Sequence, residues 1–183
     1  MEEQEQQPQP TLSLTERDRE LIAEQLRIQH AESDIERQNF TAAYVIAKKF
    51  AYETDLAEMD SDTVEDMVMK LGMQVYPRKN QYGLRSFQPQ NPSGEPIGVP
   101  PGAPLERALG NWRDQYAEAA TDPDELYFDF EYIHPFDDGN GRVGQLMWAI
   151  DNKRRYGQWP TALPPDYAEL KARYTGQPPQ STE

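Results

Sequence analysis

Hydrophobic residues recur every three or four positions along most of the chain, the spacing that places them on one face of an α-helix. Leu21, Ile22 and Leu26 mark such a face early in the sequence, and Val143, Leu146 and Ile150 mark one late in it. The predicted helices cover residues 14–30, 40–52, 62–76, a segment from Pro104 or Leu105 through Tyr116, 122–133, a segment from Gly141 or Arg142 to Tyr156, and 166–174. The sequence therefore predicts an all-α protein.

Polar and special residues at the ends of these segments support their helical assignment. Asp122 suits an N-cap, Pro123 the first helical position and Glu125 the third. Gly157 follows the late helix as a stop, with Pro160 just beyond it. The apolar pattern weakens at residues 32–39 and resumes at Phe40, so the next helical face is expected from Phe40.

A proline- and glycine-rich stretch divides the helical part of the chain at residues 77–103. Proline and glycine at this density exclude a continued helix. Short extended segments at 84–88 and 96–99 flank Asn91-Pro92-Ser93-Gly94, which favours a small β-hairpin. A hairpin of this composition is more typical of a flap than of a core element, because long loops inside compact domains are often functional.

The chain is strongly acidic. Lysine and arginine total 18 and aspartate and glutamate 32, for a formal net charge of −14. Such a surface repels a nucleic-acid backbone, so we expect no nucleic-acid partner. The cluster Lys153-Arg154-Arg155 lies at a predicted helix end, where cations interact favourably with the helix dipole and need no ligand.

Cysteine is absent, which excludes disulfides and zinc–thiolate sites and suits a cytoplasmic protein. There is no apolar leader or long apolar run, so we expect no membrane partner, although delivery into a host cell by a specialised machine stays open. Residues 1–12 and 176–183 are polar and are expected to be disordered tails around a single domain at residues 13–175.

The residues from Ile133 to Arg142 combine the chemistry of a phosphate site. Gly139 and Gly141 lack Cβ atoms and precede a helix whose first N–H groups can bind an anion. Arg142 adds a cation, Asp138 is a hard oxygen ligand suited to Mg²⁺, and His134 is a base near neutral pH. This set predicts phosphoryl or nucleotidyl transfer.

The segment His134-Pro135-Phe136-Asp137-Asp138-Gly139-Asn140-Gly141-Arg142 resembles the motif HxFx[D/E]GNGR of the Fic (Fic/Doc) family at all seven specified positions. The resemblance extends loosely over residues 32–175, and residues 82–99 followed by Pro100-Pro101 resemble the family's flap. It implies a compact all-α Fic fold with a small hairpin flap. It also implies transfer of AMP from ATP to a hydroxyl side chain of a target protein.

On this resemblance His134 is the general base and Asp138 the Mg²⁺ ligand. Gly139, Asn140 and Gly141 would form the anion hole, and Arg142 would be catalytic by binding the leaving pyrophosphate. The flap would bind the target protein as an added strand, and the family's biology leaves room for an antitoxin or another regulatory partner.

Two positions depart from the family pattern. The full motif ends in a second arginine that would also bind the nucleotide, and Gln145 stands in that place. Many relatives carry an inhibitory helix with the motif [S/T]xxxE[G/N], of which Ile35-Glu36 is retained while Glu32 and Arg37 differ. Because its usual arginine partner is missing, Glu36 would have no cation to hold, and we expect its inhibitory effect to be weak or absent.

Three functions are therefore weighed. The leading one is a protein adenylyltransferase that uses ATP with Mg²⁺. The second is a Doc-like protein kinase, since Doc also lacks the second arginine, although Gly141 is retained here and replaced there. The third is a Fic-fold protein that binds a nucleotide or a partner without turnover, an option that Gln145 keeps open.

Overall fold

The computed structural model describes residues 13–176 and confirms the all-α prediction. The predicted tails, residues 1–12 and 176–183, lie outside the described residues except for Gly176. The helices are α1 (Glu16–Ile28), α2 (Asp34–Glu53), a short 3₁₀ helix η1 (Leu56–Glu58), α3 (Ser61–Val75), α4 (Pro77–Asn80), α5 (Ala103–Glu118), α6 (Pro123–Ile133), α7 (Asn140–Tyr156) and α8 (Tyr167–Thr175). No helix among them is long and apolar enough to cross a membrane.

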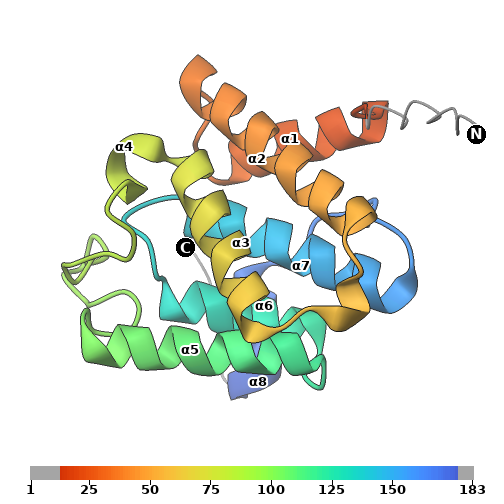
Figure 1. Ribbon diagram of the computed structural model, residues 1–183. Coiled ribbons are helices and arrows are strands. Elements are labelled where there is room, and N and C mark those ends of the chain that lie inside the picture. The colour runs from red at the N-terminus through yellow and green to blue at the C-terminus, as the bar shows by residue number, and fades with distance from the viewer. Residues whose placement is uncertain (1–12, 177–183) are drawn as a thin grey trace, which may run out of the picture.

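Helix α7 is the centre of the fold. It lies against α2, α3 and α6, while α1 packs on α2, α5 packs on α3 and α6, and α8 packs on α6 (Figure 1). Most of its residues are buried, including Val143, Leu146 and Ile150, which the sequence placed on its apolar face. Because α7 begins at the motif, its burial holds one end of the motif loop in place.

Helix ends agree with the sequence where a strong cap is present and differ where the cap is less obvious. Asp122 caps α6 and Gly157 ends α7, as predicted. The expected start at Phe40 was wrong, because α2 begins at Asp34 behind a capping box formed by Ser33 and Glu36. Its first turns are largely exposed, so they carry no apolar stripe to reveal them.

Gly144 explains how closely α6 can approach α7. A Cβ atom at this position would lie 3.0 Å from the Tyr127 ring and 3.1 Å from both Phe130 and the Glu131 carboxylate. Such distances are tighter than ordinary van der Waals contact, so a side chain here would push the two helices apart. The helix-propensity cost of a glycine in α7 is thus offset by packing at this interface.

The predicted β-hairpin is not formed as a pair of strands. Among the described residues, segment 82–99 contains a single antiparallel bridge, between Gln90 and Pro96. The three prolines at 89, 92 and 96 lack the N–H groups that a ladder needs. Two backbone hydrogen bonds, from Asn91 to Glu95 and from Ile97 to Pro89, still close the turn. Side chains take other carbonyls: Arg85 donates to Phe87 and Val99, and Gln88 donates to Ile97 and Gly98.

A buried carboxylate ties α1 to α2. Asp18 is 3% exposed and accepts hydrogen bonds from the Tyr44 hydroxyl (2.8 Å), from Lys48 Nζ (2.6 Å) and from both the backbone N–H and the hydroxyl of Thr15. Burial alone would raise the pKa of the Asp18 carboxyl, but the hydrogen bonds from Lys48, Thr15 and Tyr44 outweigh it and lower that pKa.

We expect Asp18→Asn to lower the free energy of unfolding by about 3–5 kcal/mol, because it leaves the Lys48 ammonium buried without its counter-charge. Chemical denaturation at pH 7 measures this, with the exposed Glu24→Gln on the same helix as the control. Since the folded pKa is depressed, the stabilisation is complete well above pH 3.8 and is lost as the pH falls below that value. An equal loss in both variants, or a difference that persists at the lowest pH, would contradict this account.

Candidate active site

The motif loop connects α6 to α7, and His134 is its first residue. His134 caps the C-terminus of α6 in the left-handed conformation (φ 55°, ψ 62°), and its N–H donates to the Phe130 carbonyl at 3.0 Å. This conformation ends α6 and turns the chain away from the helix axis at His134. The side chain is partly buried and faces a cavity.

Phe136 and Asn140 hold the loop shut. The Phe136 ring is fully buried against Gly72 of α3, where even a Cβ atom would lie within 2.3 Å of it. The Asn140 amide accepts from the Phe136 N–H (2.8 Å) and donates to the Phe136 carbonyl (2.9 Å). Phe136 is thus a core residue that anchors the loop. The Asn140 side chain is occupied by the loop, which leaves its backbone N–H to meet a ligand.

The N-terminus of α7 presents free backbone donors. Gly139 is its N-cap in the left-handed conformation (φ 79°) and makes no side-chain cap. In the described part of the chain, the N–H groups of Asn140, Gly141 and Arg142 donate to no acceptor, and the first intrahelical bond runs from Val143 to Gly139. Three convergent donors and the positive end of the helix dipole make this turn suited to a phosphate.

Arg142 is a buried cation with unused donors. Its side chain is 3% exposed, and Nη2 lies 3.1 Å from Asp138 Oδ1. Nε and Nη1 are buried and make no hydrogen bond. Leaving a buried donor unpaired costs free energy, so an anion that reaches these nitrogens would be held strongly.

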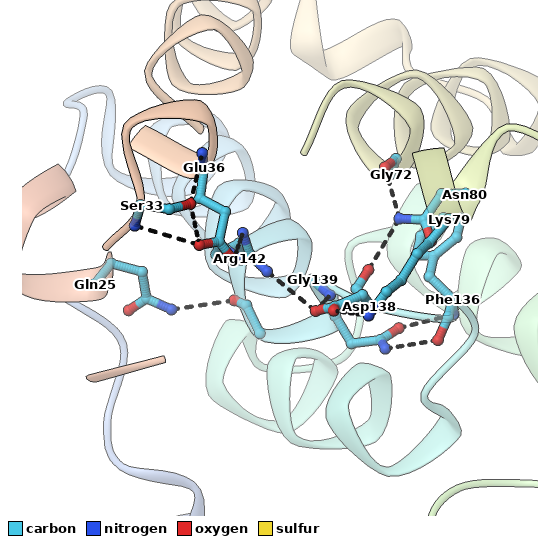
Figure 2. Close-up of polar contacts among 12 residues, drawn as sticks. Gln25, Ser33, Glu36, Gly72, Lys79, Asn80, Phe136, Asp138, Gly139 and Arg142 are labelled. Carbon is cyan, nitrogen blue, oxygen red and sulfur yellow. Dashed lines mark hydrogen bonds and ion pairs between the residues drawn. The ribbon is translucent and has the colours of Figure 1, made fainter. Parts of the chain in front are cut away.

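Asp138 bridges two cations. Its Oδ1 accepts from Arg142 and from the Gly139 N–H (2.7 Å), and its Oδ2 accepts from Lys79 Nζ at 2.7 Å (Figure 2). The hydrogen bond that Lys79 donates to Asp138 also raises the pKa of Lys79, against a smaller effect of desolvation. Within residues 13–176 there is no group of three or more acidic or histidine side chains able to cage a metal. A single carboxylate beside a phosphate site nevertheless fits Mg²⁺, which takes its remaining ligands from phosphates and water.

His134 is tuned towards its neutral form. Burial lowers the pKa of the imidazole and Arg85 lowers it further, while the Glu131 carbonyl and Asp138 partly oppose this shift. The cavity beside it, of about 400 Å³, is lined by residues from three segments: the flap stretch 91–98, the end of α6, and α8. A base that is neutral at pH 7 and borders a cavity can take a proton from a hydroxyl placed there.

The two positions where the chain departs from the family motif lie near this group. Gln145 is 4% exposed on α7, and its Oε1 is buried without a hydrogen-bond donor. Glu36 Oε1 lies 3.9 Å from Arg142 Nη1. The expectation that Glu36 has no cation to hold was therefore wrong, because α2 begins early enough to bring Glu36 to the first motif arginine.

Four further residues of this region were missed from the sequence: Lys79, Asn80, Arg85 and Glu131. Asn80 and Lys79 belong to α4, which no apolar pattern signals. Arg85 is 2% exposed and donates to the carbonyls of His134 (2.5 Å) and Ile133 (3.3 Å), which joins the flap to the motif loop. Burial raises the pKa of Glu131 to about 7, and its Oε1 has no partner. Of these four residues, only Arg85 carried a sequence signal, because it lies in the segment 82–99 that resembles the family's flap.

Comparisons with known proteins agree with this arrangement. The sequence profile of the Fic/DOC family matches residues 52–150, which include the motif. A solved structure of Fic-1 from C. elegans is similar to the chain, with a TM-score of 0.54 and 20% sequence identity over 88% of this chain. The match covers 48% of that structure, so the chain spans about half its length. A comparison with curated protein sequences found no match.

The fold of the described residues is thus that of a Fic domain, and the profile match covers more than half of the chain. The loop that the geometry singles out lies inside the matched region. The chain belongs to the Fic/DOC family.

Proposed function

We propose that the protein is an adenylyltransferase that moves AMP from ATP to a hydroxyl side chain of a target protein. The observation that carries the proposal is the buried Arg142 guanidinium, whose Nε and Nη1 have no acceptor, beside three unpaired N–H groups of α7. These unpaired donors lie together at the start of α7, and their charge suits a polyphosphate better than a neutral ligand.

In the proposed reaction a target hydroxyl oxygen attacks the α-phosphorus of ATP. His134 takes the hydroxyl proton as the new P–O bond forms, and the bond to pyrophosphate breaks. The N–H groups of Asn140 and Gly141 bind the α-phosphate oxygens, and Arg142 binds those of the leaving pyrophosphate. Burial that keeps His134 neutral supports its role as the base.

Asp138 would hold Mg²⁺ and so share it with the phosphates. When bound, the ion would neutralise charge on the phosphate oxygens. The two Asp138 oxygens accept hydrogen bonds from Arg142 and Lys79. The carboxylate thus already pairs with cations, which supports its proposed role as the Mg²⁺ ligand.

Segment 82–99 would receive the target protein. It borders the cavity next to His134, and Arg85 connects it directly to the His134 carbonyl. Because the segment makes one bridge and no strand, we expect the target's own backbone to complete the pairing on binding.

A Doc-like kinase is the second candidate, and Gln145 is the observation that favours it. A site with one motif arginine could hold the nucleotide reversed and transfer the γ-phosphate. An adenylyltransferase would transfer AMP and a kinase the γ-phosphate, so the transferred group separates these two functions. A protein that only binds nucleotide would transfer neither group.

We expect target proteins in a lysate to gain label from ATP labelled at the α-phosphate, and His134→Asn to lower the rate by roughly 10²–10⁴-fold. Asparagine tolerates the positive φ of this position, so the fold should persist. His30→Asn is the matched control, because His30 also has a positive φ (51°) but is exposed outside the motif. Label gained only from γ-labelled ATP would assign the kinase, and no label from either would leave a binding protein.

The pH dependence should follow the imidazole. Because burial lowers the pKa of His134 below 6.5, its neutral form persists through pH 7. We expect kcat/KM to be flat near neutrality and to fall only below pH 6.5 as His134 gains a proton. Glu131, with a pKa of about 7, is the nearby group that could mimic this. A fall centred near pH 7 that disappears in Glu131→Gln would assign the limb to Glu131 instead.

We also propose that Glu36 restrains Arg142 only weakly. Its Oε2 accepts from the Ser33 N–H and hydroxyl, and its Oε1 is too far from Arg142 for a hydrogen bond. Glu36→Gln keeps an acceptor for the cap and removes the charge, so nucleotide affinity should rise roughly two- to fivefold. Calorimetry measures this, with the exposed Glu32→Gln as the charge-matched control. A rise of a hundredfold would instead make Glu36 a strong inhibitor, and no rise would give it a capping role alone.

A further inference from the structure

The phosphate site has less fixed positive charge than its proposed ligand requires. Gln145 is neutral and its Oε1 has no donor, so it offers no cation to the distal phosphates. Arg85 is committed to backbone carbonyls of the flap and motif loop. Among residues 13–176, Arg142 is thus the buried cation at the start of α7 that is not committed to backbone carbonyls, and a triphosphate carries several negative charges.

Within residues 13–176, Lys79 is the second cation that pairs with Asp138 of the motif loop. Its Nζ lies 2.7 Å from Asp138 Oδ2, and it approaches from α4, on the opposite side of Asp138 from Arg142 (Figure 2). The Lys79 side chain is 49% exposed, whereas that of Arg142 is 3% exposed. Of the two cations on Asp138, Lys79 is thus the one that can move.

The backbone under Lys79 is fixed even though its side chain is not. The next residue, Asn80, is 2% exposed, and its Nδ2 donates to the carbonyls of Gly72 (2.8 Å) and Asp138 (2.9 Å). Those bonds attach α4 both to α3 and to the motif loop. Because the backbone of α4 is fixed and the four-carbon Lys79 side chain is flexible, the ammonium stays within reach of a ligand bound at the motif loop.

We propose that Lys79 is the second phosphate-binding cation of this site, in the role that the motif gives to an arginine at position 145. The inference rests on the proposed nucleotide transfer. Without substrate, Lys79 and Arg142 together neutralise Asp138. A divalent cation on Asp138 would displace the ammonium from Oδ2, and the released Lys79 would pair with oxygens of the β- and γ-phosphates.

The alternative is that Lys79 only forms a surface ion pair with Asp138, which would contribute little. The two roles predict opposite effects of Lys79→Met. If Lys79 only competes for Asp138, its removal frees the carboxylate and strengthens binding of a metal–nucleotide complex. If Lys79 binds phosphate, its removal weakens binding of ATP and leaves AMP unaffected, because AMP lacks the distal phosphates.

Isothermal titration calorimetry of the full chain with Mg²⁺ decides between them. The probes are AMP and an ATP analogue with a methylene bridge between the α- and β-phosphorus, which cannot transfer AMP. We expect Lys79→Met to weaken binding of the analogue roughly tenfold or more, the effect of losing one charge-assisted hydrogen bond, with AMP unchanged. Lys79→Arg should bind like the wild type, and so should the control Lys49→Met, which alters the same charge on an exposed pair with Glu53.

Unchanged or tighter binding of the analogue by Lys79→Met would overturn the proposal. Equal weakening for the analogue and AMP would also overturn it, because Lys79 would then support the loop and not the distal phosphates. If the wild type binds the analogue but transfers no AMP, the proposed transfer fails while the Lys79 assignment stands or falls on its own titration. If the wild type binds neither AMP nor the analogue, both the proposed AMP transfer and the Lys79 assignment are wrong.

Discussion

The two hydrogen bonds between the Asn140 amide and the Phe136 backbone are the constraint on which the site depends. They close the turn that delivers the chain from α6 to α7, and the buried Phe136 ring fixes that turn on α3. With the turn closed, the N–H groups of Asn140, Gly141 and Arg142 have no hydrogen-bond partner in the described part of the chain. The asparagine of the motif thus acts from inside the loop, where it shapes the backbone that a phosphate would meet.

The site also shows that local and overall charge can differ in sign. The chain carries a net charge of −14, yet Arg142, Lys79 and Arg85 gather around one turn with the positive end of a helix dipole. The acidic surface discourages binding of polyanions elsewhere on the molecule. A small anion that reached this turn would meet these cations and the helix dipole.

Much of this arrangement could be predicted from the sequence, because the signals were local. Helical periodicity located most helices, and caps such as Asp122 and Gly157 fixed their ends. The motif residues are contiguous, so their gathering in one loop required no knowledge of the fold.

The start of α2 was missed because its exposed turns lack an apolar face, and the contact between Glu36 and Arg142 follows from that start. Lys79 and Asn80 could not be found, because only the packing of α4 brings them to Asp138. The hairpin failed for a related reason: side chains of Arg85 and Gln88 took the carbonyls that a second strand would have used.

Arg85 has a mechanical consequence for the loop it joins. One buried guanidinium donates to carbonyls at Ile133 and His134 on one side, and at Phe87 and Val99 on the other. Two backbone hydrogen bonds, from Arg85 to Pro135 and from Val99 to Ile133, join the same two segments. Movement of segment 82–99 is therefore coupled to the backbone of His134, and on the proposed function a poorly fitting target peptide would misalign the imidazole before any bond is made or broken.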